Sequence, residues 1–351
     1  MGKNYFRKAV DAMEGYVPGF QPKVVDTIKL NTNENPYPPS PAVLEAIRAE
    51  LARLRLYPDP TADVARQQVA KLHDVDVDNV IIGNGSDELL ALAIRAFVDA
   101  GQTVSFPDPT YSLYEVLVRI QGAVNRPVPF PEDWSLPEAL FGNDSPLTLL
   151  SNPNSPTGTL MPPEEVCRLA DSLDGVLLVD EAYVDFAEID CMRLVKKHPN
   201  AIVTRTLSKS YSLAGLRFGY AVASPELVAG LMKIKDSYNV DRLAIVGGAA
   251  ALADQAHMLG NTTKIEATRA RLVIALDRLG FETLPSQANF ILTRPPGGLT
   301  AKDYFDALWK RLILIRWLDI PRVRDFVRIS IGTDDETDTL LAATREILGN
   351  R

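Results

Sequence analysis

One lysine, Lys209, lies in a stretch rich in hydroxyl groups that connects two apolar runs of the chain. The stretch reads Arg205-Thr206-Leu207-Ser208-Lys209-Ser210-Tyr211-Ser212-Leu213-Ala214-Gly215-Leu216-Arg217-Phe218-Gly219-Tyr220. A lysine that is partly desolvated, or close to other cations, has a lowered pKa and forms a Schiff base with an aldehyde. Ser208 and Arg217 are suited to bind an anion beside it. The ordinary alternative is a solvated Lys209 with Arg217 in a structural ion pair, but the surrounding residues favour a site for an anionic aldehyde.

A second group follows the apolar run Val176–Val179 and includes Asp180 and Tyr183. Ligands of open α/β sheets bind at the carboxyl ends of the strands, so Asp180 is expected to face the binding crevice. A carboxylate there can pair with a protonated pyridine nitrogen, and the Tyr183 hydroxyl can bond to a phenolic ring oxygen. Taken alone, Asp180 would be read as the cap of a turn.

Glycine turns mark a third candidate, Ile82-Gly83-Asn84-Gly85-Ser86-Asp87-Glu88, which predicts a strand, a turn and the start of a helix with Ser86 as N-cap. The backbone N–H groups of Gly85, Ser86 and Asp87 would form an anion site at the helix N-terminus. Tyr111, further along, offers an aromatic face for a flat ring. An ordinary strand-to-helix turn and a packed tyrosine are the simpler alternatives.

The fourth candidate is the proline-rich turn Ser151-Asn152-Pro153-Asn154-Ser155-Pro156-Thr157-Gly158. The amides of Asn152 and Asn154 are candidates to bond to a ring oxygen. Each of the four groups is ambiguous alone, but together they supply an anion site, an aromatic plate, a carboxylate, a hydroxyl and an amine. These are the groups that a phosphorylated aromatic aldehyde requires.

Strands and helices are predicted to alternate, as in a doubly wound, mostly parallel α/β sheet. The expected strands are Val80–Ile82, Thr103–Phe106, Leu147–Leu150, Val176–Val179, Ile202–Thr204 and Phe218–Val222. The expected helices are Pro41–Leu54, Ser86–Ala100, Pro163–Leu173, Glu226–Asp236, Arg242–Ala253 and Lys264–Leu279. A smaller α+β unit follows, with strands at Ala288–Leu292 and Val327–Ile331 and helices at Thr300–Arg311 and Asp335–Ile347.

Composition excludes several classes of protein. A chain of 351 residues with 46% hydrophobic content can bury a large core and is long enough for two domains. The formal net charge of -8 argues against nucleic-acid binding. Cys167 and Cys191 have neither the spacing of a metal site nor that of a disulfide framework, so no metal is expected. The sequence shows no apolar run that would span a membrane and no secretion signal, which predicts a cytoplasmic location without membrane association.

These motifs, with several further segments, resemble the fold-type I pyridoxal-phosphate aminotransferases, in the branch of histidinol-phosphate aminotransferase. The branch is indicated by six further segments: Leu30–Pro41, Leu56–Asp59, Ser237–Val240, Ala288–Phe290, Leu314–Arg316 and Val327–Thr333. The resemblance implies pyridoxal 5'-phosphate as cofactor and a seven-stranded sheet in the larger domain. It also implies a large domain at residues 30–255, with residues 1–29 and 256–351 forming a small domain.

Roles for individual residues follow from the resemblance. Lys209 would carry the cofactor and move the substrate proton, with Asp180 at the pyridinium nitrogen, Tyr183 at the phenolic oxygen and Tyr111 against the ring. The residues expected around the cofactor phosphate are Gly85, Ser86, Asp87, Ser208 and Arg217. The family implies a homodimer in which Tyr57 reaches the partner's phosphate. It also implies substrate contacts from Asn33, Arg316 and Arg328.

One position departs from the family pattern. Ser155 stands where an asparagine commonly precedes Pro-Thr-Gly, so the ring-oxygen contact would come from Asn152 or Asn154, or be replaced. The expected reaction exchanges an amino group between glutamate and imidazole-acetol phosphate, giving 2-oxoglutarate and L-histidinol phosphate for L-histidine biosynthesis. Three alternatives remain open, namely an aromatic amino acid aminotransferase, a lyase similar to threonine-phosphate decarboxylase, and a non-catalytic sensor of the cofactor.

Overall fold

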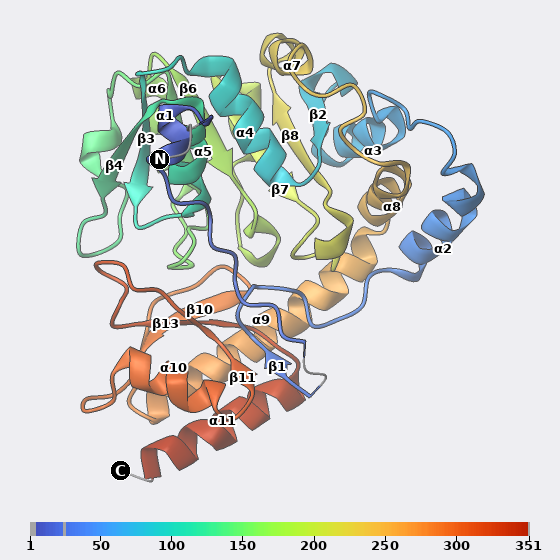
Figure 1. The fold of residues 1–351 in the computed structure, drawn as a ribbon. Coiled ribbons are helices and arrows are strands. Elements are labelled where there is room, and N and C mark those ends of the chain that lie inside the picture. Colours follow the sequence, from blue (N-terminus) through green and yellow to red (C-terminus); the bar gives the residue numbers. More distant parts are fainter. Residues whose placement is uncertain (1–4, 24–25, 350–351) are drawn as a thin grey trace.

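A seven-stranded sheet forms the centre of the larger part of the molecule (Figure 1). The computed structural model describes residues 5–23 and 26–349. The strand order is β2-β8-β7-β6-β5-β3-β4, and β8 is antiparallel to both its neighbours whereas the other pairs are parallel. The strands are β2 (Val80–Gly83), β3 (Thr103–Asp108), β4 (Val124–Pro129), β5 (Leu147–Ser151), β6 (Val176–Asp180), β7 (Ala201–Thr206) and β8 (Gly219–Ala223). The prediction of a mostly parallel doubly wound sheet is confirmed.

Helices cover both faces of this sheet, so its central strands are buried on both sides. Successive side chains of a strand point to opposite faces, and Ile81 accordingly packs in one core cluster while Val80 and Ile82 pack in another. The first face is covered by α4 (Ser86–Phe97), α5 (Leu113–Gln121) and α7 (Pro225–Met232). The second is covered by α3 (Asp63–His73), α6 (Pro163–Ser172) and α8 (Arg242–Ala253), with α2 (Pro41–Glu50) packed on α8.

The start of α4 differs from the prediction. The N-cap is Gly85, not Ser86, and no side chain caps the helix. Gly85 has φ 77° and ψ 165°, a region that only glycine adopts readily, and this conformation turns the chain directly from β2 into the helix. Ser86 is therefore the first helical residue, and the N–H groups of the first turn are left without a side-chain acceptor. The helix also ends at Phe97, before the predicted Ala100.

The smaller part contains a four-stranded antiparallel sheet with the order β12-β13-β10-β9. Its strands are β9 (Glu282–Thr283), β10 (Phe290–Arg294), β12 (Arg316–Trp317) and β13 (Val327–Ser330). The helices α9 (Gln255–Arg278), α10 (Ala301–Trp309) and α11 (Asp334–Gly349) pack with this sheet around a separate core cluster. The predicted smaller α+β unit is thus present, and α9 runs from the larger part into it (Figure 1).

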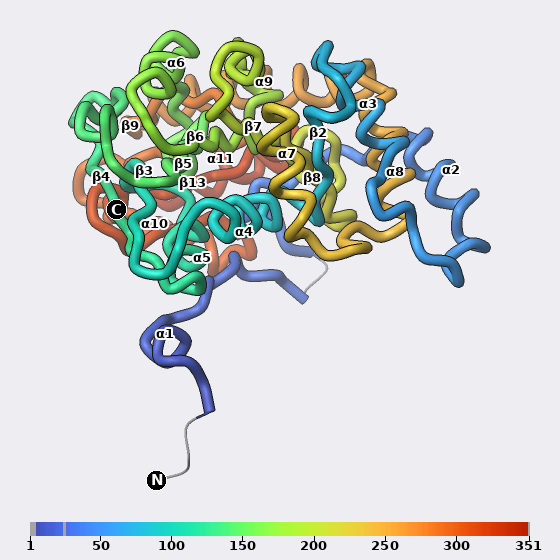
Figure 2. The backbone as a smooth tube through the Cα atoms, turned by 90° about the horizontal axis from the view of Figure 1, so that it is seen from above, coloured from blue at the N-terminus to red at the C-terminus, as the bar shows by residue number. Residues whose placement is uncertain are grey.

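The N-terminal segment contacts both parts of the molecule. Strand β1 (Ile28–Lys29) pairs in parallel with β11 (Ile313–Leu314), and Leu30 packs in the core cluster of the smaller part. Farther out, α1 (Lys8–Asp11) protrudes at the side of α5, and Arg7, just before it, donates a 2.8 Å hydrogen bond to the carbonyl oxygen of Ile120 (Figure 2). The predicted domain limits, 30–255 against 1–29 with 256–351, stay a prediction; residues 1–4, 24–25 and 350–351 of those ranges lie outside the described residues.

Short 3-10 helices complete the described structure: η1 (Leu51–Arg53), η2 (Val77–Asn79), η3 (Glu138–Leu140), η4 (Val184–Phe186), η5 (Met192–Lys196) and η6 (Ala214–Leu216). Within residues 5–23 and 26–349, none of the helices combines the length and the apolar character that crossing a bilayer requires.

Candidate active site

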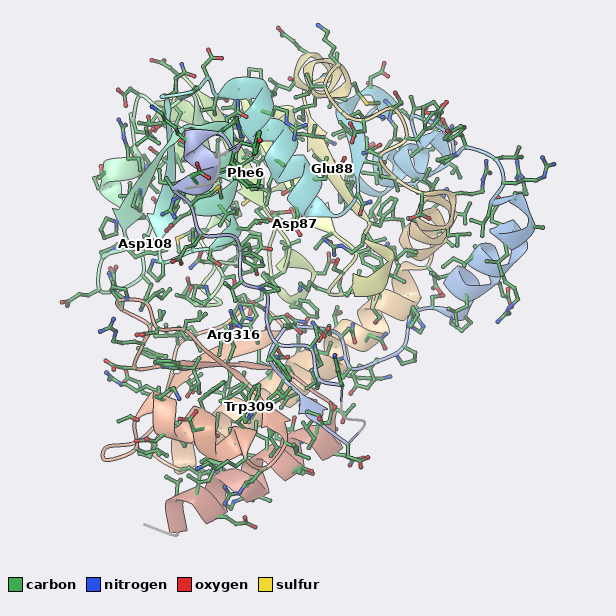
Figure 3. The ribbon with its side chains drawn as sticks, in the orientation of Figure 1. Phe6, Asp87, Glu88, Asp108, Trp309 and Arg316 are labelled. Atoms are coloured by element: carbon green, nitrogen blue, oxygen red, sulfur yellow. The ribbon has the colours of Figure 1, made fainter. Side chains whose placement is uncertain are left out.

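A cavity of about 520 Å³ lies between the two parts, at the carboxyl ends of the parallel strands. Both parts and the N-terminal segment line it, and Figure 3 shows Asp87 at the start of α4 with Arg316 below it in the smaller part. The predicted site residues found in its wall are Asn33, Ser86, Asp87, Tyr111, Asp180, Tyr183, Ser208, Lys209, Arg217, Arg316 and Arg328. The predicted residues outside the wall are Tyr57, Gly85, Asn152 and Asn154.

Lys209 presents its amine to this cavity from the turn after β7. Its Nζ donates a hydrogen bond of 3.3 Å to the carbonyl oxygen of Thr32 and lies 5.7 Å from the centre of the Tyr183 ring. In the part of the chain that the structure describes, no carboxylate forms an ion pair with this amine. An amine that is not held in an ion pair remains available to a carbonyl carbon.

Asp180 ends β6 and is buried at the floor of the cavity. Its carboxylate accepts hydrogen bonds from the hydroxyls of Tyr114, at 3.0 Å, and of Thr204, at 3.5 Å. Burial raises the pKa of the Asp180 carboxyl to about 6, although the Tyr114 hydrogen bond opposes this rise. Among the described residues no cation forms an ion pair with Asp180, and a ligand that brings a positive N–H group would stabilise its carboxylate.

Tyr183 and Asn33 form a hydrogen-bonded pair across the cavity wall. The Tyr183 hydroxyl accepts a 3.0 Å hydrogen bond from Asn33 Nδ2, and the Asn33 Oδ1 accepts from the Ser330 hydroxyl at 2.9 Å. The Tyr183 ring also packs edge-on against Phe290, with 5.0 Å between the ring centres. These contacts fix the position of the phenol and leave its own proton to donate to a ligand oxygen.

The predicted anion site is assembled from the start of α4 and the Lys209 loop. Arg217 bridges the two, since its guanidinium contacts Asp87 Oδ2 at 3.0 Å and the Ser208 hydroxyl at 3.3 Å. A Cβ atom on Gly85 would lie 2.6 Å from Arg217 Nη2, so only glycine lets the arginine approach the turn this closely. Uncapped N–H groups, a hydroxyl and a guanidinium together suit a phosphate.

Tyr111 forms a wall of the cavity above the Asp180 floor. Its hydroxyl donates to Asp87 Oδ1 at 3.2 Å, and its ring packs edge-on against Tyr114 and Tyr16 at centre distances of 5.7 and 6.2 Å. Burial raises the pKa of the Tyr111 hydroxyl above its usual range. The side chain is therefore a neutral, rigid aromatic surface.

Two arginines of the smaller part complete the cavity. Arg328 donates to the carbonyl oxygen of Asn31 at 3.0 Å and to the Ser155 hydroxyl at 3.3 Å, but its buried Nε has no partner among the described residues. Arg316 donates a hydrogen bond of 3.4 Å to the carbonyl oxygen of Val17. Burial, with Arg316 nearby, lowers the pKa of Arg328 from its usual value. Neither arginine forms an ion pair with a described carboxylate, so both are available to anions.

The structure does not support a ring contact from Asn152 or Asn154. The Asn152 amide donates to Met161 O at 3.0 Å and accepts from Met161 N at 2.7 Å. The Asn154 amide donates to Pro109 O and accepts from the Thr110 hydroxyl at 2.8 Å. Both side chains stabilise the turn and neither lines the cavity, whereas Ser155, the residue that departs from the family pattern, does.

Tyr57 lies outside the cavity of its own chain. It is 77% exposed and stacks on Tyr238 with 4.6 Å between the ring centres. Its predicted role concerns a partner subunit and remains a prediction.

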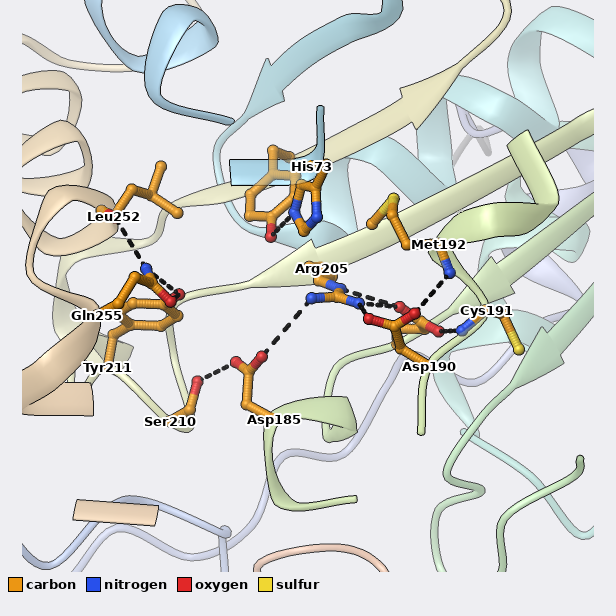
Figure 4. Close-up of polar contacts among 12 residues, drawn as sticks. His73, Asp185, Asp190, Cys191, Met192, Arg205, Ser210, Tyr211, Leu252 and Gln255 are labelled. Carbon is orange, nitrogen blue, oxygen red and sulfur yellow. Dashed lines mark hydrogen bonds and ion pairs between the residues drawn. The ribbon is translucent and has the colours of Figure 1, made fainter. Parts of the chain in front are cut away.

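An ion cluster around the buried Arg205, beside the Lys209 loop, was not predicted from the sequence (Figure 4). Arg205 contacts Glu181 at 2.8 Å and Asp190 at 2.7 Å, and it lies 3.8 Å from Asp185, which accepts from the Ser210 hydroxyl. Burial raises the pKa of Glu181 to about 7 despite the nearby Arg205. Since Glu181 follows Asp180 and Ser210 follows Lys209, the cluster ties together the two segments that carry these residues. The sequence signal that could have predicted the cluster is the position of its charged residues: Glu181 and Asp185 lie beside Asp180 and Tyr183, and Arg205 lies shortly before Lys209.

The cavity fits pyridoxal phosphate, the cofactor implied by the resemblance. The uncapped first turn of α4 and Arg217 suit its phosphate, the unpaired Lys209 amine suits its aldehyde, and the buried Asp180 suits its ring nitrogen. The guanidinium of Arg328, which lines the cavity and whose Nε has no partner among the described residues, suits a carboxylate of a substrate held above the ring.

Comparison with known proteins agrees with this reading of the site. The sequence profile of the family described as aminotransferase class I and II matches residues 25–343. Histidinol-phosphate aminotransferase 1 of Nostoc sp. is 46% identical over 351 residues, which cover 99% of both chains. The histidinol-phosphate aminotransferase of Geobacter sulfurreducens is also 46% identical, over 97% of this chain and 99% of that protein.

Solved structures are similar over the same range. The histidinol-phosphate aminotransferase of Sinorhizobium meliloti, in complex with pyridoxal-5'-phosphate, superposes with a TM-score of 0.90 at 29% identity and 99% coverage of both chains. L-threonine-O-3-phosphate decarboxylase of Porphyromonas gingivalis has a TM-score of 0.81 at 25% identity, over 92% of this chain and 99% of that one. The chain therefore belongs to the aminotransferase class I and II family, in the branch of the histidinol-phosphate aminotransferases.

Proposed function

We propose that this chain is the pyridoxal-phosphate-dependent aminotransferase that converts imidazole-acetol phosphate and L-glutamate into L-histidinol phosphate and 2-oxoglutarate, in L-histidine biosynthesis. The observation that carries the proposal is the pair Arg316 and Arg328, which lack carboxylate partners among the described residues and share one cavity with the Lys209 amine. One substrate is a dicarboxylate and the other a phosphate ester without a carboxylate. Two available guanidinium groups can serve both in turn.

The cofactor would be held by the residues that its groups fit. Ser86 and Asp87 at the start of α4, with Ser208 and Arg217, would hold the phosphate, and Gly85, whose N–H donates to Gly83 O at 2.9 Å, would shape the turn that presents them. Asp180 would pair with the ring nitrogen, and Tyr111 would cover the ring face. When bound, pyridoxal phosphate supplies an aldehyde that accepts an amino group and a ring that withdraws electrons from the neighbouring carbon.

Residues of the chain would carry out the proton transfer and the binding of the substrate. Lys209 Nζ would act as the base that takes the proton from the substrate α-carbon, because it is the unpaired amine in the cavity. The Tyr183 hydroxyl would donate to the phenolic oxygen from the position fixed by Asn33. Arg328 would bind the α-carboxylate of glutamate through its guanidinium, and Arg316 would bind the distal carboxylate or the substrate phosphate. Besides holding Tyr183 in position, Asn33 would contact the substrate.

The test is steady-state transamination with glutamate as amino donor. Imidazole-acetol phosphate should be the best acceptor, judged by kcat/KM, and 2-oxoglutarate should form in equal amounts. A higher kcat/KM with phenylpyruvate would instead assign the chain to aromatic amino acids. Arg316→Ala separates the two outcomes further, because it should impair the phosphate substrate far more than phenylpyruvate.

A lyase is the second candidate, because the Porphyromonas gingivalis decarboxylase shares the fold. Such an enzyme would release carbon dioxide from threonine phosphate without producing 2-oxoglutarate. Assaying carbon dioxide release from threonine phosphate distinguishes the two, and the aminotransferase proposal requires that none is released.

We also propose a homodimer, whose partner contact would involve Tyr57. The support is a group of exposed apolar side chains on α2, on η1 and in the loop after it: Leu44, Leu51, Leu54, Leu56 and Tyr57. Exposed apolar patches of this kind mark protein interfaces. A biosynthetic reaction on charged metabolites supports a cytoplasmic location, also as a proposal.

A further inference from the structure

The loop between β12 and β13, residues 318–326, crosses from the smaller part to the larger part. The two strands that flank it carry Arg316 and Arg328, which are register partners in the antiparallel pair of β12 and β13. Leu318 and Ile320, the next residues along the loop, line the cavity. The loop thus leads from the two arginines along the cavity wall to a tip at Arg322.

The tip contacts the larger part through Arg322. Its guanidinium donates to the carbonyl oxygens of Phe130 and Pro131, the latter at 3.0 Å, and lies 4.5 Å from the centre of the Trp134 ring. Phe130 follows β4, and its N–H donates to Asp108 O at 3.0 Å, at the end of the strand that leads to Tyr111. A planar guanidinium can stack on an indole and donate to two carbonyl groups at once. The contact therefore links the loop to the base of the opposite cavity wall.

Apolar packing supports the same contact. Val323 and Phe326 are buried with Leu292 in a small cluster of the smaller part, and Trp134 packs against this cluster. Trp134 also packs against the large core cluster of the other part, next to Phe130. Its indole thus bridges the two hydrophobic clusters.

The backbone on both sides of this contact is in the left-handed region. Trp134 has φ 60° and Arg322 has φ 70°, and neither is glycine. Such conformations persist only where surrounding contacts hold them, and they concentrate at functional contacts.

We propose that Arg322 and Trp134 form a clamp that positions Arg316 and Arg328 for the anionic groups of the substrates. Both clamp residues are positioning residues and touch no reacting atom. The proposal rests on the proposed function for its choice of substrates. The clamp predicts that loosening the loop tip weakens substrate binding and leaves the cofactor site intact.

Kinetics of Arg322→Ala test the clamp. We expect KM for glutamate and for imidazole-acetol phosphate to rise about tenfold, as for the loss of hydrogen bonds from a charged donor, with kcat changed less than about twofold. Cofactor affinity should stay as in the wild type. Arg322→Lys keeps the cation but not the planar fork, so KM should rise only about threefold. The matched control is Arg311→Ala, since Arg311 is an exposed arginine whose contacts, to Ala307 O and Glu346, stay within the smaller part.

Hydrogen exchange of the holoenzyme gives a second readout that does not depend on the reaction. In Arg322→Ala, segments 130–136 and 318–326 should both exchange faster than in the wild type, and in Arg311→Ala neither should change. Trp134→Phe retains an aromatic face. Its KM values and its exchange rates should therefore lie between those of Arg322→Ala and those of the wild type. Faster exchange in both segments supports the clamp even if the wild type fails to transaminate, an outcome that would refute the proposed function alone. Unchanged exchange, or faster exchange with unchanged KM, overturns the clamp.

Discussion

Asp180 combines a functional role with a cost to stability. Its folded pKa of about 6 lies above the unfolded value of 3.8, so the folded cofactor-free protein holds this proton more tightly than the unfolded chain. Stability should therefore fall as pH rises from about 4 to about 6 and stay lower above that range. At about 1.4 kcal/mol per pKa unit, the cost is about 3 kcal/mol.

Replacing this carboxylate should remove the pH dependence. We predict that Asp180→Asn in the cofactor-free protein raises the free energy of unfolding by about 1–3 kcal/mol at pH 8 and by little at pH 4. Urea unfolding at several pH values measures the difference. Asp174→Asn, at an exposed aspartate just before β6, is the control and should follow the wild type. Parallel pH profiles of Asp180→Asn and the wild type would disprove the assignment of this cost to Asp180.

Some side chains of the site could be predicted from the sequence and others could not. Lys209, Asp180 and Arg217 were predicted to share a cleft because their residue types and strand-end positions are local properties of the sequence, and they line one cavity. Asn152 and Asn154 were predicted as ligand contacts, but their amides are used by Met161, Pro109 and Thr110 instead. An amide in a turn has many possible partners, and only the fold decides among them.

Among the elements, the turn from β2 into α4 has the most direct consequence for cofactor binding. Gly85→Ala would place a Cβ atom 2.6 Å from Arg217 Nη2, on a backbone with φ 77°. The strain in this backbone region is about 1–3 kcal/mol, and Arg217 must also move away from the phosphate site. We predict at least a tenfold weaker affinity for pyridoxal phosphate, measured by fluorescence titration of the cofactor-free protein.

The comparison for this turn is Gly230→Ala in α7. A Cβ atom there meets no atom within 4 Å, and alanine favours a helix over glycine by up to about 1 kcal/mol. Cofactor affinity should then match that of the wild type, with unchanged or higher stability. Equal affinities in both variants would show that Gly85 does not shape the phosphate site.

Strands could be predicted from the sequence where they form a clear apolar run. The six apolar runs named from the sequence all appear as strands of the large sheet, because strands covered on both faces are apolar throughout. Strand β4 was missed because it lies at the sheet edge, is partly exposed and contains Pro127 and Pro129. The contact between Arg322 and Trp134 could not be predicted either, because it joins positions far apart in the sequence.

For the whole molecule, the proposed dimer makes a separate prediction. Leu54→Glu with Leu56→Glu puts charges into the exposed apolar surface next to Tyr57 and should produce monomers, observed by light scattering after size-exclusion chromatography. Ile274→Glu, at an apolar side chain of α9 with 53% exposure, is the control and should leave the oligomeric state unchanged. A dimer that survives the double substitution would mean that another surface forms the interface.

Tyr57→Phe examines the partner contact itself. If the Tyr57 hydroxyl reaches the cofactor phosphate of the partner subunit, its removal should weaken cofactor affinity about tenfold, as expected for a hydrogen bond to a charged group, while the dimer persists. Light scattering and cofactor titration on the same preparation separate the two effects. Unchanged cofactor affinity would contradict the contact.

The arrangement of the whole molecule places one amine, Lys209, where the strand ends of the larger part face the arginines of the smaller part. The most direct measurement is reduction of the protein with borohydride in the presence of pyridoxal phosphate, followed by peptide mass spectrometry. We predict one reduced cofactor per chain, attached to the peptide that contains Lys209, and none in Lys209→Ala. A cofactor attached to another lysine, or to none in the folded wild type, would contradict the account.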